Sequence, residues 1–220
     1  MPASRLVTNT KGGYPKKSLI GVYDKKIVCG QCEERFSPYD DYAASLLLHR
    51  AGEFEKIKNP ETGQLGGYLI REYDYHLLKM FVIATLWRAS VAEHEVYKRV
   101  KLGPFEERAR DMLLNDAPGD PQEFGVLLFA WDVDYPVMMD PFLEEIFDVQ
   151  TYRFYLGRYV AAIKVDNRPF PTELESCLLR PGQPCLLVLR HHAAAKDFQL
   201  ALGLVRQHGG YLAKAFARKE

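Results

Sequence analysis

Hydrophobic residues recur every three or four positions in the first half of the chain, which is the spacing of one buried helix face. Residues 31–49 carry this repeat, and Ser37 followed by Pro38 has the character of an N-cap and first turn, so the helix proper is expected to begin there. The clearest repeat covers residues 74–94, with Asp74 in the capping position. We predict that this segment is the central core helix.

Two further elements are predicted in the same half of the chain. Residues 104–114 are expected to form a helix, because Pro104 suits a first turn, two glutamates follow it and four apolar residues share one face. Residues 51–73 hold Asn-Pro and three glycines between two short apolar pieces, a pattern typical of a hairpin. Residues 1–28 mix Lys, Gly and Pro with short β-branched pieces, which favours a loop or hairpin arm packed on another surface.

After residue 121 the helical repeat gives way to apolar, β-branched and aromatic runs bounded by Asp, Pro and Gly. We predict strands of an antiparallel sheet over residues 125–131, 152–156, 159–165 and 185–190. A short helix over 171–179 and a terminal helix over 193–207 are expected beside them. The predicted fold class is therefore α+β, with an N-terminal arm and helix carrying a Cys-x-x-Cys turn, a helical middle, and a C-terminal antiparallel sheet with flanking helices.

Composition excludes several classes of protein. The 220 residues are 47% hydrophobic and 26% charged, which excludes a disordered chain, a collagen-like repeat and a disulfide-stapled miniprotein. Twenty-nine basic residues balance 29 acidic ones, so the formal net charge is zero. The molecule as a whole therefore lacks a strong positive electrostatic field that would attract nucleic acid, and only a local basic patch could do so. The N-terminal residues lack an apolar leader, and no apolar run is long enough to span a membrane. We expect a cytoplasmic protein with reduced thiols.

The strongest chemical motif is the pair Cys29 and Cys32 in the sequence Cys-Gly-Gln-Cys. This spacing after a short strand lets two thiolates converge on one tetrahedral zinc ion, which needs four ligands. Cys177 and Cys185 lie in a predicted helix and strand, and we interpret them as small buried hydrophobes. The close pair is either half of a zinc site or a vestigial knuckle. A redox role is disfavoured, because no βαβ context surrounds the motif.

Charged residues offer weaker candidates. The acidic clusters at residues 33–34, 40–41 and 132–140 could bind magnesium, but such groups are usually a solvated rim. The histidines at 49, 76 and 94 lie near predicted helix ends, where a helix cap is the simplest interpretation. Four lysines of the arm, beside two tyrosines, could contact phosphate and stack on a base, or simply form a soluble surface. These candidate nucleic-acid or partner contacts are Lys16, Lys17, Lys25 and Lys26.

The segment from Gly21 to Ala43, with GVYDKKIVCGQCEERFS at its start, resembles a family of bacterial proteins related to HNH endonucleases. The resemblance continues through LWRASV at 86–91, KLG at 101–103, the predicted strands at 152–166 and LRPG at 179–182. In fuller members, an upstream Cys-x-x-Cys and a His-containing segment precede this region. The resemblance implies that they complete a zinc knuckle with the equivalents of Cys29 and Cys32, and that the His is the general base of a ββα-metal nuclease.

Residues 1–28 contain no Cys and no His, so the resemblance leaves the general base and half of the zinc ligands without counterparts. The chain is then either a naturally shortened, non-catalytic relative, or its recorded start lies downstream of the true one. On this basis we divide the chain into a zinc-knuckle-like, truncated HNH-like arm and helix at residues 1–50 and an α+β domain at 51–220.

The residues support three functional hypotheses. We rank first a non-catalytic, HNH-related binding protein that acts on a protein or nucleic-acid partner, in phage defence, toxin inhibition or a mobile element, with zinc as its candidate cofactor. The second is a magnesium- or manganese-dependent endonuclease whose site is rebuilt from carboxylates and His49 or completed by a partner chain, with Glu33 as the first catalytic candidate. The third is a zinc-free structural or dimerising protein. Any zinc ligands beyond Cys29 and Cys32 would come from elsewhere in the chain or from a homodimer.

Overall fold

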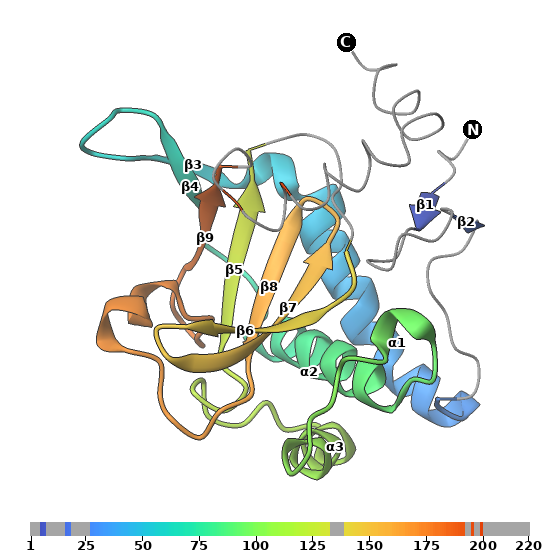
Figure 1. Ribbon diagram of the computed structural model, residues 1–220. Helices are drawn as coiled ribbons and strands as arrows, with labels where there is room; N and C mark the ends of the chain where they lie inside the picture. The colour runs from blue at the N-terminus through green and yellow to red at the C-terminus, as the bar shows by residue number, and fades with distance from the viewer. Residues whose placement is uncertain are drawn as a thin grey trace.

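The computed structural model describes residues 27–132, 139–191, 195 and 199, together with the backbone of residues 5–7 and 16–18. Within these residues the fold is α+β, as predicted, with helices in the N-terminal half and a seven-stranded sheet that is mostly antiparallel (Figure 1). The backbone of β1 (Arg5–Val7) pairs antiparallel with that of β2 (Lys16–Ser18), in the segment expected to form a hairpin arm. The predicted terminal helix at 193–207 lies outside the described residues, apart from residues 195 and 199.

Helix α1 (Gly30–Ala44) begins seven residues before the predicted start at Ser37, so that prediction was wrong. Cys29 is the N-cap, and Pro38 lies inside the helix. A proline in this place removes one backbone donor, but Phe36 and two later residues of α1 bury an apolar face that compensates. Tertiary packing therefore stabilises α1 across Pro38, although this proline locally favours the start of a helix. The chain continues as a π-helical turn, η1 (Ser45–His49), and a 3₁₀ turn, η2 (Ala51–Glu53).

Helix α2 (Tyr75–Val91) is the central core helix, as predicted, although it ends three residues earlier than expected. The Oδ1 atom of Asp74 accepts a hydrogen bond from the N–H of Leu77 at 3.0 Å, which is the predicted cap. After the 3₁₀ turn η3 (Glu95–Tyr97), helix α3 (Phe105–Asn115) confirms the helix predicted over 104–114. Among the described helices, none is both long and apolar enough to cross a membrane.

Replacing Asp74 with alanine is expected to lower the free energy of unfolding by about 1 kcal/mol, the usual contribution of an N-cap side chain. The reason is that the Leu77 N–H loses its only side-chain acceptor at the exposed start of α2. Asp74→Ser is the matched control, because serine also caps and should retain most of the stability. Urea unfolding of the two variants measures the difference; equal losses would show that the cap does not stabilise α2.

The seven strands follow the order β3-β4-β9-β5-β8-β7-β6. The hairpin predicted over 51–73 is confirmed, and it joins this same sheet through antiparallel pairing of β4 with β9. Two features differ from the predicted antiparallel sheet: β9 runs parallel to β5, and β6 was not predicted. The bounds are β3 (Glu55–Lys58), β4 (Leu65–Ile70), β5 (Val126–Trp131), β6 (Phe142–Ile146), β7 (Val149–Leu156), β8 (Tyr159–Lys164) and β9 (Cys185–Arg190).

Both faces of the central strands are buried. Along β5, Leu128 and its alternate neighbours pack in the cluster that also holds Phe36 of α1 and Leu86 of α2. The intervening residues Leu127 and Trp131 face two smaller clusters on the opposite side. The 3₁₀ helix η4 (Thr172–Cys177), in the place of the short helix predicted over 171–179, borders that second face. Helices α1 and α2 thus cover one face of the sheet and position the start of α1 at one side of the molecule (Figure 1).

Candidate functional site

Cys29 and Cys32 lie together at the exposed start of α1. Cys29 has extended backbone angles and occupies the N-cap position, while Cys32 is in the first turn, where three-residue spacing brings two side chains to one face. The structure contains a bend at residues 27–28 in place of the expected short strand before the motif. Cys29 is exposed, and all four cysteines are free thiols. The start of a helix, rather than a turn after a strand, therefore presents the pair.

The two thiols differ in acidity because they interact with each other. Interaction with the backbone N–H of Cys32, and then with its thiol, lowers the pKa of Cys29. The same thiol contact raises the pKa of Cys32. The positive end of the α1 dipole also favours a thiolate at this position. Cys29 is consequently the better nucleophile and metal ligand of the pair.

The described residues supply only half of a tetrahedral zinc site. Among residues 27–132 and 139–191, no group of three His, Cys, Asp or Glu side chains is arranged to hold a metal ion. His49 ends η1, beyond the far end of α1, and the rise of a helix places it about 30 Å from Cys29. A nuclease site that combines His49 with the motif is therefore inconsistent with the fold.

Glu33 is exposed in the first turn of α1, and its backbone N–H donates to the carbonyl oxygen of Cys29 at 3.0 Å. Asp40, from the neighbouring acidic pair, lies two turns further along α1 and is bound by Arg88 through two hydrogen bonds of 2.8 and 2.7 Å. This ion pair joins α1 to α2. Glu33 therefore shares the first turn with the thiols, whereas the Asp40 carboxylate has a structural role.

The remaining sequence candidates are dispersed. Lys16 and Lys17 are described only as backbone of β2, and Lys25 and Lys26 lie outside the described residues. In the acidic segment 132–140, Asp132 contacts His191 at 3.1 Å and Asp140 is buried, while residue 134 lies outside the described part of the chain. The structure thus brings none of these groups into a described cluster with the thiol pair.

Cys177 and Cys185 are separate from the motif, as predicted. Cys185 is 1% exposed in β9, and burial raises the pKa of its thiol to about 12, so it remains protonated. Cys177 ends η4 and is partly buried close to Cys185. The interpretation as a small buried hydrophobe is confirmed for Cys185.

A second polar cluster, which sequence analysis did not identify, joins the three main helices. The Oδ1 atom of Asp116 accepts hydrogen bonds from the Tyr39 hydroxyl at 2.5 Å and from Nε2 of His76 at 2.7 Å. Burial, and then the bond to Asp116, raise the pKa of Tyr39 to about 12, and the bond from Tyr39 lowers the pKa of Asp116. The three residues lie far apart in the sequence, so no local pattern identifies them. Because Tyr39 and His76 both bond Asp116, the cluster holds the three helices together and has a structural role.

A cavity of about 290 Å³ lies between α3, residues 120–124 and the chain after β8. Its charged groups are paired within the protein: Arg108 bonds Glu123, and the ammonium group of Lys164 donates to the carbonyl oxygen of Arg168 at 2.7 Å. Lys79, which is fully buried, donates to the carbonyl oxygens of residues 123 and 124 of the cavity lining, each at 2.7 Å. Because buried polar groups in a folded protein need hydrogen-bond partners, these bonds indicate a structural role for the polar groups at the cavity.

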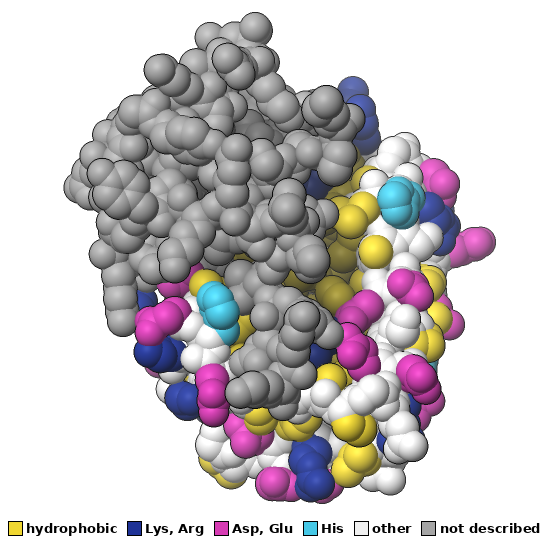
Figure 2. Space-filling model, turned by 90° about the vertical axis from the view of Figure 1, so that its right-hand side faces the viewer, with side chains coloured by type: hydrophobic (Ala, Val, Ile, Leu, Met, Phe, Trp, Pro, Cys, Tyr) yellow, Lys and Arg dark blue, Asp and Glu magenta, His cyan; other side chains and the backbone are white. Residues whose placement is uncertain are grey.

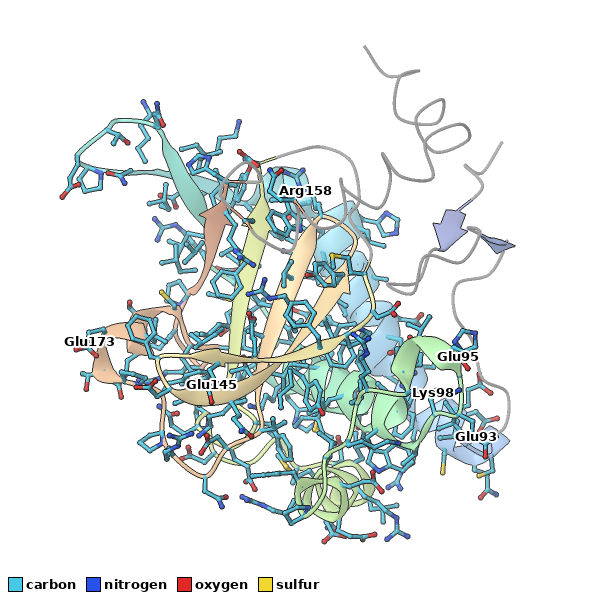
Figure 3. The ribbon with its side chains drawn as sticks, viewed as in Figure 1. Glu93, Glu95, Lys98, Glu145, Arg158 and Glu173 are labelled. Atoms are coloured by element: carbon cyan, nitrogen blue, oxygen red, sulfur yellow. The ribbon has the colours of Figure 1, made fainter. Side chains whose placement is uncertain are left out.

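The surface around the start of α1 has no single sign of charge. Figure 3 shows Glu93, Glu95 and Lys98 on the same side of the molecule as this helix start, and Lys98 forms an ion pair with Glu95. On the face drawn in Figure 2, basic and acidic side chains of the described residues are interspersed without a continuous basic patch. The described part of this face therefore lacks the footprint of a nucleic-acid interface. No protein-family model, curated protein or solved structure matches the chain.

Proposed function

We propose that the chain is a non-catalytic binding protein that associates with a second polypeptide through a zinc ion shared at Cys29 and Cys32. The observation that carries the proposal is the pairing of two thiols, one of lowered pKa, at the exposed start of a 15-residue helix. Zinc prefers thiolate and imidazole ligands in a tetrahedral arrangement. Two thiolates therefore supply half of its coordination.

The second half of the site is proposed to come from another copy of the chain. Among the described residues no third ligand joins the pair, and nucleic acid does not offer thiolates. A second copy brings an identical Cys29 and Cys32, so two exposed helix starts supply four thiolates around one ion. A two-fold arrangement of this kind is the commonest symmetry of soluble oligomers.

The test is zinc content per chain, measured together with molar mass in solution on protein purified without chelator. We expect one zinc ion per two chains and a dimer that a chelator converts to monomers. Cys29→Ser and Cys32→Ser should each remove the zinc and the dimer, because two thiolates per copy are needed to fill the site. The serine variants should remain folded, since Cys29 is exposed and Cys32 only partly buried.

Cys177→Ser is the matched control, because this thiol lies outside the motif and should leave zinc content unchanged. One zinc ion per monomer would contradict the shared site and place the other ligands within the same chain. Protein without zinc would contradict the proposal entirely and favour the interpretation of the motif as a relic.

The nuclease hypothesis, with Glu33 as catalytic residue, stays a prediction. It requires cleavage of DNA or RNA that depends on magnesium or manganese and is abolished by Glu33→Gln. The binding proposal expects no cleavage by either protein and normal zinc content in Glu33→Gln, whose side chain is exposed. The cellular setting suggested by the resemblance, phage defence or toxin inhibition, likewise stays a prediction.

A further inference from the structure

The two edges of the seven-stranded sheet are built differently. Edge strand β3 exposes Glu55, Lys56 and Lys58, and charged side chains of this kind discourage pairing with another chain. Edge strand β6 instead exposes Leu143, which is 48% accessible, and leads into Phe147, which is 62% accessible. Among the described residues, β6 pairs only with β7. One edge is thus protected from further strand pairing, and the other carries apolar side chains.

Alternation along β6 separates an inner and an outer set of side chains. Phe142 lies under the guanidinium group of Arg153, which also binds Glu144 through two hydrogen bonds of 2.6 Å, so both residues pack on β7. Leu143 and Glu145 occupy the alternate positions and are exposed. In a strand, alternate residues share one face, so Leu143 and Glu145 lie together on the outer face of β6. Phe147 follows in the turn, so the exposed side chains along this part of the chain are apolar, acidic and apolar in order.

The turn after β6 holds Phe147 in an unfavourable backbone conformation. Ile146 pairs with Val149, so Phe147 and Asp148 form a two-residue hairpin loop, with φ angles of 50° and 61°. Both values lie in the left-handed region, which Asn and Gly favour in such loops and which costs a bulky residue of order 1 kcal/mol. A strained, exposed phenylalanine contributes little to the fold and suggests contact with a partner.

The charges beside this edge indicate the chemistry of that partner. Glu145 and Asp148 are exposed. Hydrogen bonding to Asp166 is the main cause that raises the pKa of the Arg168 guanidinium group, and the nearby charges of Glu145 and Asp148 raise it further. That guanidinium group is itself held by Asp166, so the two exposed carboxylates keep the edge acidic. Full antiparallel overlap of two β6 strands would place the exposed Glu145 carboxylates of both copies on one face as diagonal neighbours, which disfavours a second copy.

We infer that β6 and the turn residue Phe147 form a docking edge for an extended segment of a different protein, in which apolar residues that meet Leu143 and Phe147 flank a basic one that meets Glu145. The segment adds to the sheet by main-chain hydrogen bonds along the open edge of β6, and its side chains supply the selectivity. The β6–β7 turn lies on the opposite side of the molecule from the start of α1 (Figure 1). This inference extends the proposed binding function to a second surface and does not depend on Cys29, Cys32 or zinc.

The test uses a labelled peptide with valine, lysine and valine at alternate positions and threonine between them, titrated with the full chain in the presence of a chelator. We expect saturable binding that weakens at least about tenfold in Phe147→Asn, the loss typical of removing an interface anchor. Asparagine tolerates a positive φ, so the variant should be at least as stable as the natural protein in urea. A loss of affinity without a loss of stability separates docking from folding.

Three controls define the mode of binding. Replacing lysine by glutamate in the peptide, or methylating its backbone nitrogens at alternate positions, should each reduce affinity at least about tenfold, because the first removes charge complementarity and the second removes main-chain donors. Lys56→Thr, on the protected edge β3, should leave affinity unchanged. Absence of saturable binding, equal affinity for the glutamate peptide, or unchanged affinity in Phe147→Asn would overturn the inference. A zinc-independent dimer that Phe147→Asn dissociates would also overturn it, in favour of a second copy.

Discussion

Replacing Lys79 with alanine is expected to lower the free energy of unfolding by about 3–5 kcal/mol, the range for a change that removes a buried partner and opens a cavity. Lys79 is fully buried in α2 and donates hydrogen bonds to two carbonyl oxygens of the segment before β5. Truncation leaves both carbonyls buried without their donor, at about 1–3 kcal/mol each. Lys79→Met keeps most of the side-chain volume, so the difference in free energy of unfolding between the two variants gives the contribution of the cavity.

The same residue should make stability depend on pH. Burial lowers the pKa of Lys79 from 10.5 to about 7, whereas the unfolded chain keeps the ordinary value. Between these two values the unfolded state binds the extra proton, so the free energy of unfolding rises as pH increases from about 7 towards 10, by at most about 1.4 kcal/mol per pH unit. The neutral amine still has two N–H donors for the two carbonyls.

Urea unfolding between pH 6.5 and pH 9.5 measures this rise, and Lys79→Met should remove most of it. Lys164 is a necessary control, because burial also lowers the pKa of its ammonium group and it contributes with the same sign. Lys164→Met should therefore reduce the rise by a smaller amount. A natural protein whose stability falls over this pH range would contradict the assignment of Lys79.

Predictions from sequence succeeded where the structural signal is local. Asp74 and the apolar repeat that follows it specify α2, and Pro104 with two glutamates specifies α3. The start of α1 was misplaced because Pro38 carries a local signal for a first turn, while burial of Phe36 against α2 decides the outcome. Tertiary packing overrides a local preference in this case.

Features that depend on distant partners were not predicted. Strand β6 contains two adjacent glutamates, and its inner one is accommodated by Arg153 on the next strand. The sequence identified the thiol pair but not its position at a helix start, which places His49 a full helix length away. Lys79 lies in an apolar helix and its acceptors are 44 and 45 residues distant, so no spacing rule identifies it.

Gly67→Ala is expected to lower the free energy of unfolding by about 2–4 kcal/mol, in the range of core overpacking and backbone clashes. In β4, an added Cβ would lie 2.4 Å from the carbonyl oxygen of Leu187 in β9. Because the clashing atom belongs to the backbone of β9, the added methyl group can be accommodated only if β4 and β9 move apart. Gly52→Ala is the matched control, because nothing lies within 4 Å of its added Cβ and stability should remain within about 0.5 kcal/mol. Urea unfolding compares the two variants, and equal stability would contradict the close approach.

Hydrogen exchange on Gly67→Ala also tests how the hairpin is coupled to the sheet. Strand β9 pairs with β4 on one side and parallel to β5 on the other, so it is the only described strand that joins the hairpin to the rest of the sheet. If the hairpin is a separate cooperative unit, the variant should lose amide protection in β3 and β4 while β5 and β8 keep theirs. Loss of protection in all four strands would show that the parallel β9–β5 pairing transmits the clash, and that the two halves of the sheet fold as one unit.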